Sequence, residues 1–147
     1  MRSRRPAPAL LLDTCAVIWL QNGDAMTRSA IEAIVRAGRS ERILISPISA
    51  WEIGLLSRPG ARRAAPLQFL PDAKTWFQKT MAAPGIKAAP MTPEIAIDAS
   101  FLPGDLHSDP ADRIIIATAR HLRVPVVTRD HRIINYGGLG HVDVIAC

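Results

Sequence analysis

The sequence predicts a single α/β domain in which a parallel sheet is covered by helices. Short apolar runs typical of buried strands alternate along the chain with segments whose apolar residues recur at helical spacing. The 147 residues suit one domain and leave little room for a second. Hydrophobic residues make up 48% and charged residues 21%, the balance of an ordinary globular protein. We expect the domain to span residues 9–147 and residues 1–8 to form a flexible basic tail.

The first part of the chain supplies two of the expected strands and three helices. Residues 9–12 are a short buried strand, and a helix over residues 14–20 follows it. A second helix, capped by its first threonine and ended by a glycine, covers residues 27–38. Residues 42–46 form the second strand. Ser49 is the expected N-cap of the third helix.

The middle of the chain contains a weaker strand between two helices. A loop rich in alanine, proline and arginine covers residues 58–71, after which Asp72 caps a helix. Residues 86–89 are the third strand. The helix over residues 92–101 follows, with Pro93 at the first helical position, where proline is tolerated.

The last part of the chain carries the most regular apolar patterns. A helix over residues 109–122 leads into the clearest strand, residues 124–128, and residues 142–146 form a short final strand. Helices therefore separate the first four strands from one another, as a parallel sheet requires, while no helix is predicted between residues 128 and 142.

Charge and cysteine usage limit the setting in which the protein works. The net charge of +5 and the isoelectric point near 10.0 favour a polyanionic partner, such as nucleic acid or an acidic protein. Cys15 and Cys147 are expected to be free thiols in a reducing compartment, which predicts a cytoplasmic protein. No membrane segment or signal peptide is expected, because Asp13 interrupts the first apolar stretch.

Acidic residues recur at equivalent places in these units. Asp13 follows the first strand, Asp130 lies just beyond the fourth, and Glu52 falls in the expected first turn of the helix after the second. Parallel strands bring such residues to one edge of the sheet. Asp112 comes from the first turn of another helix, where Asp109 has the spacing of the N-cap.

Several carboxylates at one edge predict a metal site. Carboxylates brought close together repel one another and cannot all remain ionised at neutral pH without a cation. Hard divalent ions with oxygen ligands, Mg²⁺ or Mn²⁺, are the natural counter-charge. Such ions can activate water and stabilise the leaving oxygen when a phosphodiester is cleaved. For any one of these acids taken alone, a helix cap or a partner of the helix dipole is the better interpretation, but four acids at matching strand ends are harder to explain in that way.

Four segments resemble the acidic motifs of PIN domains, in that family's order and across nearly the whole chain. They are Leu-Leu-Leu-Asp13-Thr-Cys-Ala-Val-Ile-Trp-Leu, Ile-Ser-Ala-Trp-Glu52-Ile-Gly-Leu-Leu, His107-Ser-Asp109-Pro-Ala-Asp112-Arg-Ile-Ile-Ile-Ala-Thr-Ala and Val-Val-Thr128-Arg-Asp130. Each segment is weakly specific alone, but the ordered set is specific. Within the family, the chain resembles the VapC toxins of bacterial toxin–antitoxin pairs.

The resemblance implies a fold, an activity and partners. The fold would be a three-layer sandwich with a central five-stranded parallel sheet flanked by helices. The activity would be that of an Mg²⁺- or Mn²⁺-dependent endoribonuclease, usually a homodimer, inhibited by a VapB-like antitoxin. Asp13, Glu52, Asp112 and Asp130 would form the catalytic, metal-binding quartet, with Asp13 and Asp112 as the main ligands. Thr128 would help to hold a ligand or water, and Asp109 would be an auxiliary acid or only a cap.

The resemblance also suggests a role for the basic surface. Arg58, Arg113 and Arg129 are candidates for binding the RNA backbone, together with Arg62, Arg63 and Arg132. A solvated arginine-rich surface is the competing interpretation. We expect Trp19, Trp51 and Trp76 in the core, Cys15 packed under the sheet, and no catalytic role for the loop residue His107.

Other functions compete with a toxin nuclease. A phospho-acceptor signalling domain also clusters acids around Mg²⁺ but needs a lysine at a late strand end, and none of Lys74, Lys79 and Lys87 is placed there. A PIN-fold binding module without catalysis remains open. So does a PIN nuclease that processes RNA without an antitoxin.

Overall fold

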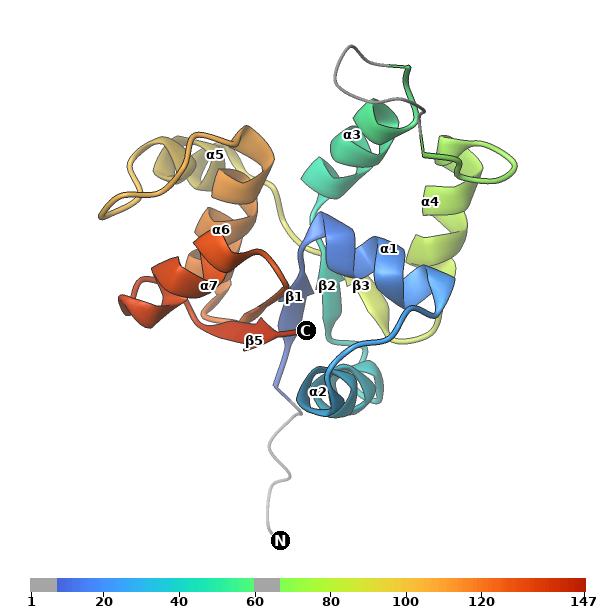
Figure 1. Ribbon diagram of the computed structural model, residues 1–147, viewed down its shortest axis with the longest axis horizontal. Coiled ribbons are helices and arrows are strands. Elements are labelled where there is room, and N and C mark those ends of the chain that lie inside the picture. The colour runs from blue at the N-terminus through green and yellow to red at the C-terminus, as the bar shows by residue number, and fades with distance from the viewer. Residues whose placement is uncertain (1–7, 60–66) are drawn as a thin grey trace, which may run out of the picture.

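The computed structural model describes residues 8–59 and 67–147, which form an all-parallel sheet of five strands in the order β3-β2-β1-β4-β5 (Figure 1). The predicted fold class is therefore confirmed. Each strand is shorter than the sequence predicts: β1 is Leu10–Leu12, β2 Ile43–Ile45, β3 Ile86–Ala88, β4 Val126–Thr128 and β5 Val144–Ala146.

Seven helices are present in the described residues, one more than predicted. They are α1 (Thr14–Asn22), α2 (Arg28–Gly38), α3 (Pro47–Leu56), α4 (Ala73–Ala82), α5 (Pro93–Ser100), α6 (Pro110–Leu122) and α7 (His131–Gly138). The unpredicted helix is α7, a short element that ends in two glycines and has weak helical propensity. It forms because Asp130 caps it and because Ile133 and Tyr136 are buried against the sheet.

The third helix begins earlier than predicted, which moves Glu52 from the first helical turn to the second. The N-cap is Ser46, whose hydroxyl accepts from the backbone N–H of Ile48 at 3.2 Å, and Pro47 occupies the first helical position. Ser49, the predicted cap, is fully buried inside the helix.

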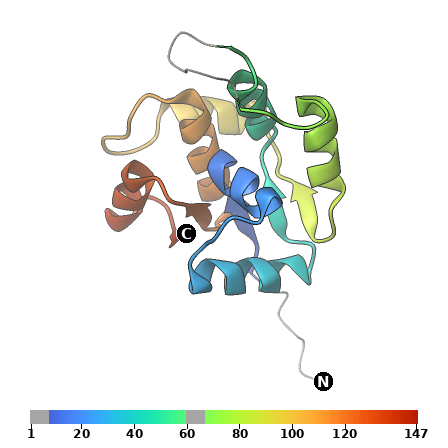
Figure 2. The same ribbon diagram turned by 45° about the vertical axis from the view of Figure 1, so that its right-hand side comes forward.

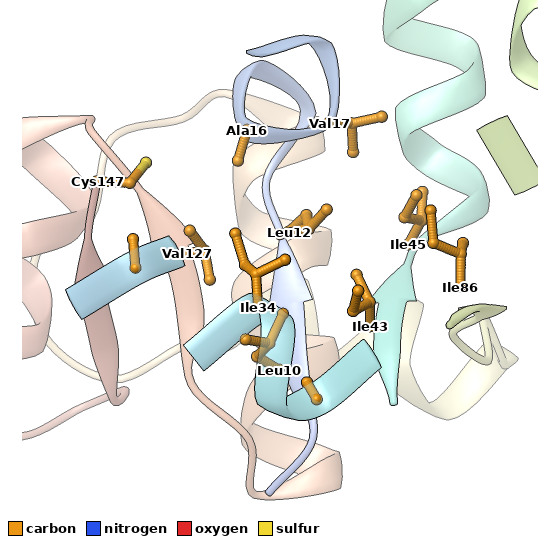
Figure 3. Packing of buried hydrophobic residues seen from close by; sticks show 12 residues of the cluster. Leu10, Leu12, Ala16, Val17, Ile34, Ile43, Ile45, Ile86, Val127 and Cys147 are labelled. Atoms are coloured by element: carbon orange, nitrogen blue, oxygen red, sulfur yellow. The ribbon is translucent and has the colours of Figure 1, made fainter. Parts of the chain in front are cut away.

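Helices cover both faces of the sheet, so the predicted three-layer arrangement is confirmed. Leu10 and Leu12 of β1 lie close to Ala16 of α1 and Ile34 of α2 (Figure 3). Residues of α4 pack against the same cluster, whereas Leu11 packs with residues of α6 and α7. This alternation follows from the two-residue period of a strand. Figures 1 and 2 show α6 and α7 on one side of β1 and α4 on the other, while α1 and α3 lie beyond the ends of β1 and β2.

Strand order places the reversal of the chain's winding between β1 and β4. From β1 the chain adds β2 and β3 on one side, and β4 and β5 then extend the sheet on the other. Leu11 pairs with Val126 and Leu12 with Val127, so the two strands end at neighbouring positions. Loops leaving two such strands diverge to opposite faces and open a crevice at their carboxyl ends.

The structure confirms some of the predictions about single cysteine and tryptophan residues and contradicts others. Cys15 and Cys147 are free thiols as predicted, but Cys15 is exposed rather than packed under the sheet. The prediction that Trp51 lies in the core is wrong, since half of its surface is exposed. Trp19 and Trp76 are partly buried and pack against the core. The tail residues 1–7 and two of the candidate arginines, Arg62 and Arg63, lie outside the described residues. Within the described ranges, no helix is long and apolar enough to cross a membrane.

Replacing Gly85 by alanine should destabilise the fold. Gly85 has a φ of 86°, and an added Cβ would lie 2.8 Å from the Cα and carbonyl oxygen of Gly38. We expect a loss of about 2 kcal/mol in the free energy of unfolding, measured by urea denaturation. The matched control is Gly54→Ala in α3, where an added Cβ meets nothing within 4 Å. That variant should be neutral or more stable by about 0.5–1 kcal/mol, and equal effects of the two would contradict the prediction.

Candidate functional site

The four predicted acids meet in one pocket at the carboxyl ends of β1 and β4. The pocket has a volume of about 290 Å³. Its lining includes Asp13, Glu52, Asp112 and Asp130, together with Thr14, Cys15, Trp19 and Arg129. Residues separated by more than a hundred positions in sequence are thus neighbours, as the strand-end argument predicts.

Asp13 is the most deeply buried of the four acids, with 6% of its surface exposed. It caps α1, since one carboxylate oxygen accepts from the backbone N–H of Ala16 at 2.7 Å. The other oxygen accepts from the hydroxyl of Thr128 at 2.5 Å. Burial nevertheless raises the pKa of Asp13 from 3.8 to about 6, because these two hydrogen bonds only partly offset the lost hydration.

Asp130 caps α7 on the other side of the crevice. Its carboxylate accepts from the backbone N–H of Arg132 at 2.8 Å and from the guanidinium of the same residue at 3.0 Å. The hydrogen bond from the Arg132 side chain lowers the pKa of Asp130. The backbone N–H of Asp130 in turn donates to the Thr128 hydroxyl at 3.0 Å. Thr128 therefore links Asp13 to the loop that carries Asp130.

Glu52 reaches the pocket from the second turn of α3. The hydroxyl of Thr14 donates to its carboxylate and lies 3.0 Å from the hydroxyl of Ser49. Burial raises the pKa of Glu52 from 4.5 to about 7, and the negative charge of Asp112 adds to the effect. These contacts join the start of α1 to α3 and hold the carboxylate over the crevice.

Asp112 enters from the first turn of α6. Asp109 is the N-cap of this helix and accepts from the backbone N–H of Asp112 at 2.9 Å, so the predicted capping role of Asp109 is confirmed. Burial raises the pKa of Asp112 as well. The carboxylate of Asp112 lies 2.7 Å from Nε2 of His107, which precedes the helix by three residues.

His107 is the residue of the pocket edge that sequence reasoning underrated. Because a carboxylate only accepts, the imidazole donates its Nε2 proton to Asp112. Among the described residues, Nδ1 of His107 is the one buried side-chain polar atom without a hydrogen-bond partner. The signal was its place in the His107-Ser-Asp109-Pro segment, five residues before Asp112.

The donors of this edge are suited to a cation. One possible ligand atom each from His107, Asp112 and Asp130 lies within 4.8 Å of the others, although a ring nitrogen that donates its proton to Asp112 cannot also bind the ion. Asp13 and Glu52 add two carboxylates to the same pocket, and burial raises the pKa of both. A group of oxygen donors in that condition fits a hard divalent ion.

The candidate RNA-binding arginines differ in their freedom to bind a phosphate. The Arg113 side chain donates to three carbonyls, those of Ala99, Leu106 and His107. Arg129 donates to the carbonyls of Ala25 and Cys147 and stacks on Trp19, 3.8 Å from the ring centroid. Both guanidinium groups thus brace the walls of the site. Arg58 is exposed beyond the end of α3.

Comparisons with known proteins give one family. Residues 10–139 match the family described as PIN domain. Over 125 residues the chain is 29% identical to Ribonuclease VapC22 of Mycobacterium tuberculosis, an alignment covering 84% of this chain and 88% of that protein.

Solved structures agree in fold. The chain is similar to VapBC2 from Rickettsia felis bound to a DNA fragment from their promoter, with a TM-score of 0.64 and 12% identity over 94% of this chain and 98% of that chain. It is also similar to DNA-bound VapBC from Salmonella typhimurium, with a TM-score of 0.62 and 16% identity over 95% and 98% of the two chains. At such identities these structures establish a shared fold. Because the family match spans nearly all of the described sheet and helices, the chain belongs to the PIN-domain family.

Proposed function

We propose that this chain is a divalent-metal-dependent endoribonuclease, the toxin of a VapBC-type toxin–antitoxin module. The observation that carries the proposal is the convergence of Asp13, Glu52, Asp112 and Asp130 on one pocket. Its PIN-domain family membership and its 29% identity to a ribonuclease support the same activity. RNA is the proposed substrate, since the chain carries a net charge of +5 and RNA is a polyanion.

Mg²⁺ or Mn²⁺ is the proposed cofactor, with Asp13 and Asp112 as its main ligands and Glu52 and Asp130 completing the acidic set. When bound, such an ion activates water and stabilises charge on the leaving oxygen of a phosphodiester. The protein's own groups would orient the ligands. The hydroxyl of Thr128 donates to one carboxylate oxygen of Asp13, and the backbone N–H of Ala16 at the start of α1 donates to the other. His107 likewise donates to a carboxylate oxygen of Asp112.

The pocket environment also favours hydrolysis at this edge. Glu52 is held in place by the hydroxyl of Thr14, and without a metal ion burial raises its pKa to about 7. The exposed Arg58 and the net charge of +5 would attract the RNA backbone and make binding weaker at high salt. Arg113 and Arg129 contribute by holding the walls rather than by reaching for phosphate.

The proposed partners are a VapB-like antitoxin that inhibits the nuclease and a second copy of the chain. The structural relatives that support the first are VapBC proteins. A homodimer is consistent with the apolar surface of α5, where Ile97 is 61% exposed and Phe101, its C-cap residue, 80% exposed. The proposed compartment is the cytoplasm, which keeps Cys15 and Cys147 as thiols.

Asp112→Asn and Asp13→Asn should each abolish RNA cleavage. Both replacements keep the shape of the side chain but remove a charged ligand, so we expect a loss of about a hundredfold or more. The measurement is cleavage of a mixed cellular RNA pool by antitoxin-free protein with Mg²⁺ or Mn²⁺, and with EDTA. Asp109→Asn is the matched control, because asparagine caps a helix nearly as well as aspartate.

The outcomes of that experiment distinguish the proposed nuclease from its alternatives. Cleavage lost with EDTA and in both variants but kept in Asp109→Asn would support the proposed site. Near wild-type cleavage by Asp112→Asn would contradict the assignment of Asp112 as a metal ligand. An absence of cleavage by the metal-loaded wild type would favour a PIN-fold binding module. Cleavage without toxicity on expression and without an antitoxin gene beside its own would favour an RNA-processing nuclease.

The metal-free protein should lose stability as the pH rises from about 4 to about 8. The pKa of Asp13 is raised from 3.8 to about 6 and that of Glu52 from 4.5 to about 7. A raised pKa means that the stabilisation is complete below the ordinary value and is lost as the pH passes the folded-state value. For Asp13 this loss corresponds to about 3 kcal/mol.

Urea denaturation of wild type and Asp13→Asn across this pH range checks the prediction. The two should be similar at the acidic end, and the variant should be more stable at the alkaline end because asparagine carries no charge to desolvate. Saturating Mn²⁺ should stabilise the wild type more than the variant. Parallel pH profiles for the two proteins would show that Asp13 carries no buried charge.

A further inference from the structure

Arg132, the second residue of α7, is bound to two of the site carboxylates. Its guanidinium makes two hydrogen bonds to Asp130, from Nε at 3.3 Å and from Nη2 at 3.0 Å. The same Nη2 lies 3.9 Å from Oδ2 of Asp112. One arginine therefore bridges acids that come from the first turn of α6 and from the end of β4.

The two carboxylates that Arg132 contacts, Asp112 and Asp130, are also possible ligands of the cation. Possible ligand atoms of His107, Asp112 and Asp130 come within 4.8 Å of one another. His107 and the Arg132 guanidinium both approach Oδ2 of Asp112. The guanidinium and a divalent ion are both attracted to these two carboxylates and repel each other, so the two positive charges compete.

The Arg132 side chain can move away from the two carboxylates at little energetic cost. Its side chain is 60% exposed, so swinging it into solvent uncovers no apolar core. The helix cap does not depend on it either, because Asp130 accepts from the backbone N–H of residue 132, which any non-proline residue provides. An exposed ion pair of this kind is weak and can be exchanged for a stronger counter-charge.

We propose that Arg132 is the resident counter-ion of Asp130 and Asp112 and that the catalytic divalent ion binds only by displacing its guanidinium. The inference rests on the proposed metal site and adds a residue that sets its affinity. The apparent dissociation constant for the ion is the intrinsic constant divided by the fraction of molecules in which the arginine is undocked. In the metal-free protein, the same contact offsets the repulsion between the two acids.

The test is titration of metal-free protein with Mn²⁺ by calorimetry, at constant pH and ionic strength. We expect Arg132→Gln to lower the dissociation constant about three- to tenfold. Arg132→Lys keeps the charge without the paired hydrogen bonds, so its dissociation constant should lie between those of Arg132→Gln and the wild type.

The matched control is Arg36→Gln. It removes the same charge at the opposite edge of the sheet, where Arg36 lies beside Leu10 and Pro125 at the amino ends of the central strands. Its dissociation constant should stay within about twofold of the wild type, since distant exposed charges are screened. If Arg132→Gln and Arg36→Gln bind Mn²⁺ equally, the competition does not exist.

Asp112→Asn separates this inference from the proposed function. Loss of Mn²⁺ binding in that variant, with no gain in Arg132→Gln, would leave the metal site standing and overturn only the role of the arginine. Wild-type binding by Asp112→Asn would overturn the site itself. A second readout is thermal: Arg132→Gln should melt below Arg36→Gln without metal, and saturating Mn²⁺ should abolish that difference.

Discussion

The hydroxyl of Thr128 is the contact on which the carboxyl edge of the sheet depends. It is fully buried at the end of β4, donates to Asp13 beyond β1 and accepts from the backbone N–H of Asp130. An ionised carboxylate as buried as Asp13 is costly unless it is hydrogen-bonded. One side chain thus supplies that bond and sets the direction in which the chain leaves β4. The starts of α1 and α7 diverge from this point, and the pocket lies between them.

Much of the fold could be predicted because strands and helices leave local signals. The alternating apolar runs gave all five strands within a few residues, and Asp72, Thr27 and Asp109 cap the helices that their sequence neighbours predict. The errors came where tertiary contacts decide. Ser46 rather than Ser49 caps α3 because Pro47 fits the first helical position, and α7 forms because burial of Ile133 and Tyr136 outweighs its glycines.

The acids of the site could be predicted because strand ends of a parallel sheet converge, but their neighbours could not. His107 comes from a loop, and no periodicity shows where a loop side chain points. Arg132 is a candidate for binding RNA in the sequence, yet its pairing with Asp130 follows from α7, which the sequence did not predict. Trp51 adjoins apolar residues in sequence, but its face of α3 turns outward. Such details depend on packing between elements rather than on local pattern.

The separation of Thr128 from Asp13 by 115 positions has a consequence for synthesis on the ribosome. A nascent chain exposes Asp13 early, but the hydroxyl that orients it and the strand that completes the crevice emerge only when most of the chain has been translated. Contacts so distant in sequence form late in folding. A product truncated before β4 would keep three of the four acids and still lack an assembled site. A complete quartet of acids therefore exists only in a chain that has been translated past Asp130.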